Sequence, residues 1–312
     1  MRILIVGAGA LGGYFGARLQ AAGRDVTFLV RPARVEPLAK QGLHVLSPNG
    51  DVSIEHPAIV TAEQLSEPFD LILLSCKAYD LESAMDSFAG AVGPGTSILP
   101  LLNGMAHLDA LDARFGRARV LGGLSRISAV RQPDGSIAHL GTWDSIYFGD
   151  RDDPDSARAH RVAEALANAG FELHLSPTIL QAMWDKWCTI ATAAGITCLM
   201  RGSVGDIVAA GGTSLVVQLL AECAAIAAHE GFPPSQAAID RISGMLTEPG
   251  SLFTASMLRD LESGAPVEAH HILGDLLAHA QRGGVPAPLL NIAHTHVRCY
   301  EERTQREWTT KN

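Results

Sequence analysis

A glycine-rich segment near the start of the chain has the spacing of a loop that binds phosphate. Its residues are Gly7, Ala8, Gly9, Ala10, Leu11 and Gly12, which fit the pattern G-x-G-x-x-G. The segment follows the apolar run Arg2–Val6 and opens a stretch of helical character, Leu11–Ala22. Such glycines allow a tight turn and close approach to a pyrophosphate, while the helix N-terminus offers free N–H groups. The segment therefore predicts a dinucleotide site; a strand–helix turn that binds nothing is the alternative.

The end of the second predicted strand indicates which dinucleotide binds. The run Val26–Val30 is followed by Arg31, and no carboxylate appears until Glu36. NAD sites commonly carry Asp or Glu here to hold the ribose 2′-hydroxyl, whereas an arginine can make a bidentate contact with a 2′-phosphate. The pattern favours NADPH or NADP+ as the coenzyme; an ordinary exposed loop arginine is the other interpretation.

Two polar residues follow later strand-like runs. Lys77 comes after Leu71–Ser75, and Asn103 comes after Ser97–Leu102 and before Gly104. Ligands of doubly wound sheets bind at the carboxyl ends of the strands, and an asparagine amide can both donate and accept hydrogen bonds. Both residues are therefore candidates for coenzyme or substrate contact. A solvated lysine and a simple Asn-Gly turn are the alternatives.

Lys186 is the candidate proton donor. It lies in a predicted helix next to Trp184 and Trp187, and an ammonium group beside a keto oxygen can polarise it and then donate a proton. Ser256 and Glu268 are further candidates, with Glu268 at the start of a helix. The alternatives are a surface lysine on an amphipathic helix and a carboxylate favoured by the helix dipole.

The elements that must position these residues change in kind along the chain. Up to about residue 175, short apolar runs alternate with helical stretches, which predicts a parallel sheet with crossover helices. Leu43–Leu46 and Val52–Ile54 predict a hairpin around an Asn-Gly turn. Strand-like runs between Val120 and Phe148 predict an antiparallel addition to that sheet, and Asp155 is the predicted N-cap of the next helix.

Beyond Pro177 the pattern is almost wholly helical. We therefore expect an α/β chain in which residues 1–176 form a Rossmann-type, doubly wound NADP-binding domain and residues 177–312 form an all-helical substrate domain. Such an apolar helical domain can also form a homodimer. The predicted helices are Ile179–Ala194, Ser214–Glu230, Ser235–Leu246, Ala255–Ser263, Val267–Arg282 and Pro288–Arg303.

Composition excludes several classes of protein. Of 312 residues, 47% are hydrophobic and 18% are charged, which excludes a disordered chain. A net charge of −9 gives no general attraction to nucleic acid or to an anionic membrane, and no run of about 18 apolar residues predicts a membrane span. Five scattered cysteines without a Cys-x-x-Cys pair indicate free thiols in a cytoplasmic protein and no metal site.

Taken together, these features resemble the ketopantoate (2-dehydropantoate) reductase family over essentially the whole chain. The segments that carry the resemblance are Gly7–Gly12, Leu29–Arg31, Ser75–Ala78, Leu102–Met105, Trp184–Lys186, Ser256–Asp260 and Glu268. The resemblance implies a helical domain like the C-terminal domain of 6-phosphogluconate dehydrogenase. It also implies a cytoplasmic enzyme of pantothenate biosynthesis that uses NADPH to reduce a 2-oxoacid, 2-dehydropantoate to (R)-pantoate or a close analogue.

The resemblance also assigns roles to the candidates. It makes Lys186 the general acid, with Glu268 assisting this lysine or the substrate hydroxyl. It places Asn103 and Ser256 on the substrate. The coenzyme contacts that it implies are the segment Gly7–Gly12, Arg31, Lys77 and Asn103.

Two positions depart from the family pattern. The family often carries asparagines four and eight residues after the catalytic lysine, where this chain has Ile190 and Ala194. Polar partners for a substrate hydroxyl would then be missing. A related dehydrogenase acting on a less polar 2-oxo or 2-hydroxy acid is the alternative within enzymes, and an NADP-binding sensor without turnover is the alternative of another class.

Overall fold

The computed structural model describes the backbone of residues 1–311 and the side chains of residues 1–307, and it divides the chain into two units. Unit 1 contains Met1–Leu102 and His107–Ile179. Unit 2 contains the described chain from Leu180 onward together with the short segment Asn103–Ala106. The predicted domain boundary near residue 176 leaves Asn103–Ala106 in the first domain. The structure instead groups this segment with the helices of unit 2.

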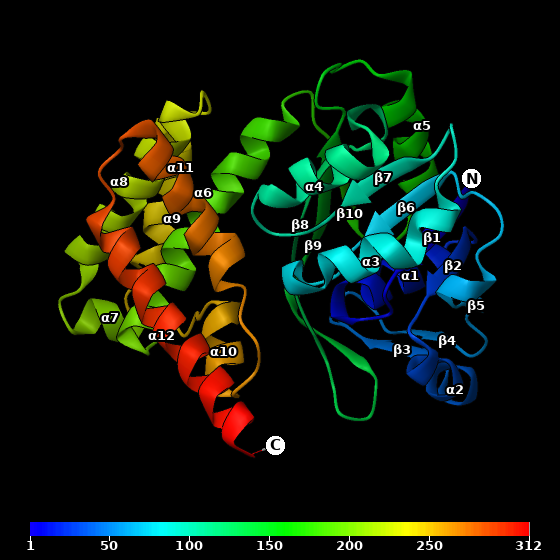
Figure 1. The fold of residues 1–312 in the computed structure, drawn as a ribbon, viewed down its shortest axis with the longest axis horizontal. Helices are drawn as coiled ribbons and strands as arrows, with labels where there is room; N and C mark the ends of the chain where they lie inside the picture. The colour runs from blue at the N-terminus through cyan, green and yellow to red at the C-terminus, as the bar shows by residue number, and fades with distance from the viewer. Residues whose placement is uncertain (312) are drawn as a thin grey trace. The chain divides into compact units, whose positions relative to one another are not determined.

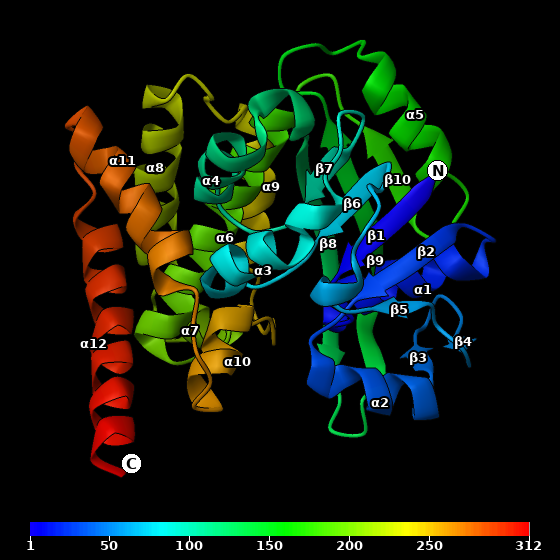
Figure 2. The ribbon, with the colours of Figure 1, turned by 45° about the vertical axis from the view of Figure 1, so that its right-hand side comes forward.

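A parallel sheet of five strands forms the first layer of unit 1, as the alternating pattern predicts (Figure 2). The strand order is β5-β2-β1-β6-β7. The strands are β1 (Arg2–Val6), β2 (Asp25–Leu29), β5 (Ile59–Val60), β6 (Leu71–Leu74) and β7 (Ser97–Pro100). All four residues of β6 and of β7 are buried, which is typical of parallel strands covered on both faces. The helices of the unit are α1 (Ala10–Ala21), α2 (Pro32–Gln41), α3 (Leu81–Phe88), α4 (Ala106–Phe115) and α5 (Ala157–Leu166).

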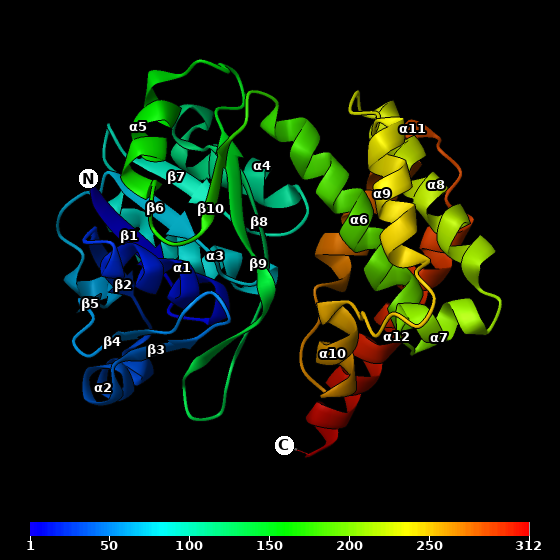
Figure 3. The ribbon, with the colours of Figure 1, turned by 180° about the vertical axis from the view of Figure 1, so that it is seen from behind.

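A second sheet takes the strands that were expected to extend the first one. Its order is β10-β9-β3-β4, with β8 paired to β9. The strands are β3 (Leu43–Leu46), β4 (Val52–Ile54), β8 (Gly122–Arg131), β9 (Ile137–Gly149) and β10 (Glu172–Leu175). The predicted β3–β4 hairpin is confirmed. The expected antiparallel addition to the first sheet is wrong, because β8 and β9 form a long hairpin whose other neighbours are β3 and β10 (Figure 3).

Helix α1 packs between the two sheets of unit 1 and is buried on all sides over most of its length. Toward the second sheet, the Tyr14 hydroxyl donates to Asp144 Oδ2 at 2.5 Å. The guanidinium of Arg18 donates to the Gly50 carbonyl at 2.7 Å. The ring of Phe15 meets that of Phe171 at a centroid distance of 5.0 Å. The helix that follows the glycine loop is thus held by segments from across the unit.

The cap of α5 differs from the expected one. The Ser156 hydroxyl, not Asp155, accepts the Ala159 N–H as N-cap, at 3.5 Å. Both residue types suit this position, so the local pattern did not distinguish them. Single-turn 3₁₀ helices η1 to η4 complete the unit, at Ala62–Gln64, Ala78–Asp80, Ala89–Ala91 and Arg117–Arg119.

Unit 2 is helical throughout (Figure 1). Its helices are α6 (Ile179–Met200), α7 (Val204–Ala209), α8 (Thr213–His229), α9 (Gln236–Leu246), α10 (Ser256–Glu262), α11 (Asp275–Gly283) and α12 (Pro288–Lys311). Helix α7 was not predicted. The helix expected over Val267–Arg282 is present from Ala269 to Gly283, but His270–Gly274 form a π-helix that continues directly into α11. A π-helix inserts a residue into the turn, which periodicity alone does not indicate.

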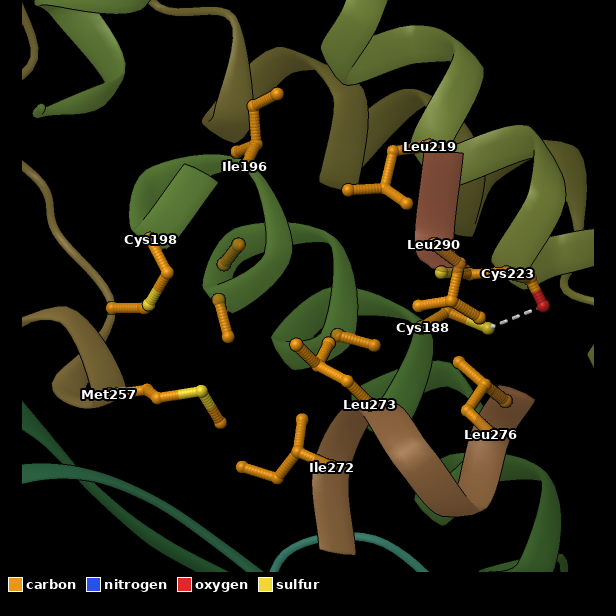
Figure 4. Packing of buried hydrophobic residues seen from close by; sticks show 14 of the residues in the cluster. Cys188, Ile196, Cys198, Leu219, Cys223, Met257, Ile272, Leu273, Leu276 and Leu290 are labelled. Atoms are coloured by element: carbon orange, nitrogen blue, oxygen red, sulfur yellow. Dashed lines mark hydrogen bonds between the residues drawn. The ribbon is translucent and has the colours of Figure 1, made fainter. Parts of the chain in front are cut away.

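One apolar core holds the helices of unit 2 together. Figure 4 shows Ile272 and Leu273 of the π-helix in the same cluster as Cys188 of α6 and Leu219 of α8. The buried carboxylate of Glu222, on α8, accepts the Leu290 N–H of α12 at 2.9 Å. A polar group therefore ties the start of α12 to the core.

Candidate functional site

The glycine loop of unit 1 is open where a dinucleotide would approach. Gly7 has a φ of +91°, a conformation that favours glycine, and its N–H donates to the Leu29 carbonyl at 2.9 Å. Gly9 is exposed and lies at the N-cap of α1. A Cβ atom on Gly7 or Gly9 would have no heavy atom within 4 Å, so empty space faces both backbones. Free N–H groups at a helix N-terminus beside such a space fit a pyrophosphate.

Gly12, in contrast, lies in crowded surroundings and allows the helix to pack closely against the loop and the sheet. A Cβ atom there would lie 2.3 Å from the Gly7 carbonyl oxygen and 2.4 Å from Ser75 Oγ. The third glycine of the pattern therefore serves close packing of helix and strand, while Gly7 and Gly9 face open space.

Arg31 and Lys77 lie at the carboxyl edge of the first sheet, where the glycine loop also lies. Arg31 follows β2 and Lys77 follows β6, and both strands pair with β1. The guanidinium of Arg31 is 72% exposed and pairs with Asp80, with Nη2 2.6 Å from Oδ1. Asp80 was not among the predicted site residues, although its position three residues after Lys77 places it in the same loop. This edge therefore carries both a cation and an anion beside the glycine loop.

Lys186 lies half-buried on α6 in unit 2, between fully buried aromatic neighbours. Trp184 and Trp187 are 3% and 1% exposed and stack obliquely, with ring centroids 4.9 Å apart. The ring of His279 packs edge-on against both and bonds to Glu230 at 2.7 Å. These rings fix the turn of α6 that carries Lys186.

The π-helix joins the turn of Lys186 to the segment of Glu268. The indole N–H of Trp187, the residue after Lys186, donates to the Ile272 carbonyl at 2.9 Å. The Ile272 N–H in turn donates to the Glu268 carbonyl at 3.0 Å. Two hydrogen bonds that share Ile272 therefore link the neighbourhoods of the predicted acid and the predicted carboxylate. π-helices frequently occur at functional sites.

His271 of the same π-helix holds the Asn103 segment. Its ring bonds to the Asn103 backbone, and its carbonyl oxygen lies so close to Gly104 that a Cβ there would stand 2.7 Å away. Burial lowers the pKa of His271, and the nearby carboxylates of Glu268 and Asp275 oppose the shift. A neutral imidazole is thus favoured beside Asn103. Asn103, Lys186 and Glu268 lie in segments that one π-helix connects.

The other positions of unit 2 that the sequence analysis singled out are Ser256, Ile190 and Ala194. Ser256 is exposed and is the first residue of α10. Ile190 is half-buried against the core, and Ala194 is 2% exposed inside it. An asparagine in place of Ala194 would therefore need a buried hydrogen-bonding partner. The apolar residues at these two positions belong to the packing of the helical core.

No three His, Cys, Asp or Glu side chains gather as potential metal ligands within the described residues. Nor does any helix in that part of the chain have the length and hydropathy to cross a membrane. A surface cavity of about 170 Å³ lies between α2, β3 and the β8–β9 turn. Its lining includes Arg34, His44 and Asp134 and none of the predicted site residues.

Sequence reasoning missed three residues that contact or support the candidates: Asp80, Trp187 as a hydrogen-bond donor, and His271. Nothing in the local pattern signals a π-helix, so the contact between His271 and Asn103, far away in sequence, had no signal in the chain.

Comparisons with known proteins agree over the whole chain. The family model described as ketopantoate reductase PanE/ApbA matches residues 3–153, and the model of its C-terminal part matches residues 178–301. An uncharacterized oxidoreductase, YkpB of Bacillus subtilis, is 34% identical, covering 96% of this chain and 99% of its own. The crystal structure of a 2-dehydropantoate 2-reductase from Geobacter metallireducens superposes with a TM-score of 0.88 at 31% identity, covering 96% of this chain and 99% of that one.

A ternary structure of D-mandelate dehydrogenase with NADH and anilino(oxo)acetate also superposes, with a TM-score of 0.88 at 24% identity. The match covers 98% of this chain and 99% of that one. At this identity the likeness shows the fold alone.

Proposed function

The chain belongs to the ketopantoate reductase family, and on that premise we propose that it reduces a 2-oxoacid to a 2-hydroxy acid with NADPH. The observation that carries the proposal is the π-helix of unit 2, which connects the segments of Asn103, Lys186 and Glu268. The open glycine loop of unit 1 supports binding of a dinucleotide, because a Cβ atom on Gly7 or Gly9 would meet no other heavy atom within 4 Å. Gly7 to Gly12, Arg31, Lys77 and Asn103 would hold the coenzyme.

The chain's own residues divide the remaining work. A nicotinamide coenzyme held by these residues would supply the hydride that reduces the keto carbon. Lys186 polarises the keto oxygen through its ammonium group and donates the proton that the developing alkoxide requires. Glu268 carries a negative charge that orients the ammonium group or accepts from the substrate hydroxyl. Asn103 and Ser256 donate hydrogen bonds that position the substrate.

The substrate that we propose is 2-dehydropantoate or a close analogue. A 2-oxoacid with an apolar side chain is the second candidate, favoured by Ile190, which is half-buried one helical turn after Lys186, whereas Ala194 lies inside the core. An apolar lining offers a substrate hydroxyl no partner, although it rejects that hydroxyl only weakly. The second candidate therefore predicts a lower kcat/KM for 2-dehydropantoate than for 2-oxoisovalerate, which lacks the hydroxymethyl group, and the first candidate predicts the reverse.

Coenzyme oxidation in the presence of a panel of 2-oxoacids tests the proposal. Turnover with at least one 2-oxoacid is expected, and the ranking of kcat/KM values decides between the two substrates. Binding of NADPH without turnover on any of them would instead favour the sensor that the sequence left open.

Coenzyme choice has its own test in Arg31→Ala. Loss of a charged hydrogen bond, roughly 1.5–3 kcal/mol, should weaken NADPH binding by about 10- to 150-fold and leave NADH binding nearly unchanged.

All five cysteines are free thiols, which supports a reducing, cytoplasmic location. The homodimer through the helical unit stays a prediction, to be tested by light scattering.

A further inference from the structure

The Arg31–Asp80 ion pair joins the two loops on either side of the glycine loop. Arg31 follows β2, whereas Asp80 ends the 3₁₀ helix η2 that follows β6. Strand β1 lies between β2 and β6, and its last residue, Val6, is in register with Leu29 on one side and Leu74 on the other. The pair therefore spans the carboxyl end of β1, where the glycine loop begins.

The carboxylate of Asp80 does not cap the helix that it precedes. Asp80 is the N-cap of α3, a position where aspartate normally accepts a backbone N–H of its own helix, but its side chain makes no such bond. Its backbone is fixed locally, since its N–H donates to the Lys77 carbonyl at 2.9 Å and its carbonyl accepts the Ser83 hydroxyl at 3.1 Å. The carboxylate reaches instead to Arg31, 49 residues away in sequence.

We propose that Asp80 sets the coenzyme preference of this chain by competing with a 2′-phosphate for Arg31. The inference rests on the proposed function, in which a nicotinamide dinucleotide lies at the glycine loop. NAD sites carry a carboxylate at the end of the second strand; here that strand end lacks one, and Asp80 supplies it from the neighbouring loop.

NADPH and NADH would interact differently with the carboxylate of Asp80. A phosphate and a carboxylate are both acceptors for the guanidinium fork, so a 2′-phosphate on Arg31 displaces Asp80 and then has a like charge beside it. A ribose 2′-hydroxyl can donate to the same carboxylate. Because the pair is exposed, it opens readily and its effect comes from the charge of Asp80 rather than from a locked contact. Asp80 therefore weakens NADPH binding relative to NADH binding, and the wild type binds both.

Asp80→Asn keeps the size of the side chain and removes its charge. The dissociation constants of NADPH and NADH are measured by titration, together with those of 2′,5′-ADP and 5′-AMP, which differ only in the 2′-phosphate and lack the nicotinamide. The affinity ratio of the phosphorylated to the unphosphorylated ligand should rise about tenfold in both pairs, equivalent to about 1.4 kcal/mol. Asp80→Glu keeps the charge and should leave the ratio within about threefold of the wild type, less than half a decade.

Asp152→Asn is the matched control. It removes the same charge from another exposed pair, in which Asp152 Oδ1 lies 2.7 Å from Arg117 Nη2. This pair lies at the amino edge of the first sheet, because Arg119 of the same 3₁₀ helix donates to the Gly93 carbonyl just before β7. The control should leave the ratio unchanged.

Each other outcome counts against a specific statement. A ratio that Asp80→Asn leaves unchanged, or that Asp152→Asn shifts equally, overturns the role of Asp80, while turnover of the wild type keeps the proposed function intact. A wild type that binds neither coenzyme overturns both.

Discussion

Exchanging single glycines of the loop for alanine should separate its two tasks. Gly9→Ala should spare the fold and weaken coenzyme binding, whereas Gly12→Ala should destabilise unit 1. The difference follows from the surroundings: a methyl group meets nothing within 4 Å at Gly9, but it meets the Gly7 carbonyl oxygen at 2.3 Å at Gly12.

The expected sizes follow from these contacts. The Gly12 methyl would press on backbone, which cannot move cheaply, so overpacking should cost about 1–3 kcal/mol. For a unit of this size that lowers Tm by about 2–12 °C. At Gly9 the poorer N-cap is offset by the lower entropy of the unfolded chain, so the net change should stay below about 1 kcal/mol. The new methyl occupies the space of the pyrophosphate, and coenzyme affinity should fall by about tenfold or more.

Thermal unfolding followed by circular dichroism, and coenzyme titration by fluorescence, measure the two effects separately. A Gly9→Ala protein that binds NADPH as the wild type does would refute the assignment of the loop as a pyrophosphate cradle. A Gly12→Ala protein of unchanged Tm would refute the packing argument.

Lys186→Ala should lower kcat by about 10²–10⁴ and leave NADPH binding intact, and Lys186→Arg should not restore the rate; near-normal turnover in a folded Lys186→Ala protein would remove the lysine from the mechanism. Trp187→Phe, which loses the bond to the Ile272 carbonyl, should lower kcat by about tenfold at unchanged coenzyme affinity, whereas a purely structural role would lower Tm alone. Burial opposes ionisation of Asp150, but Arg158 at 2.6 Å and backbone donors lower its pKa to about 2, so its ionised form stabilises the fold above the ordinary carboxyl pKa. Asp150→Asn should cost about 1–2 kcal/mol at neutral pH in urea unfolding, and the difference should shrink as the pH falls from about 4 toward 2; a pH-independent difference would contradict this.

Local sequence patterns predicted the helices and strands themselves better than they predicted which strands pair with one another. The run of β6 and the Asn-Gly hairpin of β3 and β4 were identified because burial and turn chemistry act over a few residues. The placement of β9 was wrong because the free edges of a long hairpin can pair with strands of either sheet, and the choice depends on β3 and β10, far away in sequence.

The same difference between local patterns and contacts of distant segments applies to the candidate site. The glycine loop, Arg31 and Lys186 could be identified because a motif or a strand end locates them. The contact of His271 with Asn103 depends on a π-helix and on an excursion of the chain into unit 2, and neither leaves a periodic signal. The engagement of Arg31 by Asp80 depends on strand order, which only the folded sheet defines.

The burial of α1 between two sheets has a consequence for the order of folding during synthesis. The helix leaves the ribosome early, but its buried face is completed by Asp144 and by Phe171, the latter near the end of unit 1. Contacts of such high sequence separation form late and slowly. Until the chain through Phe171 has emerged, Tyr14 and Phe15 lack these partners and expose apolar surface that chaperones can bind. The glycine loop that precedes α1 should therefore be among the last parts of unit 1 to acquire its native structure.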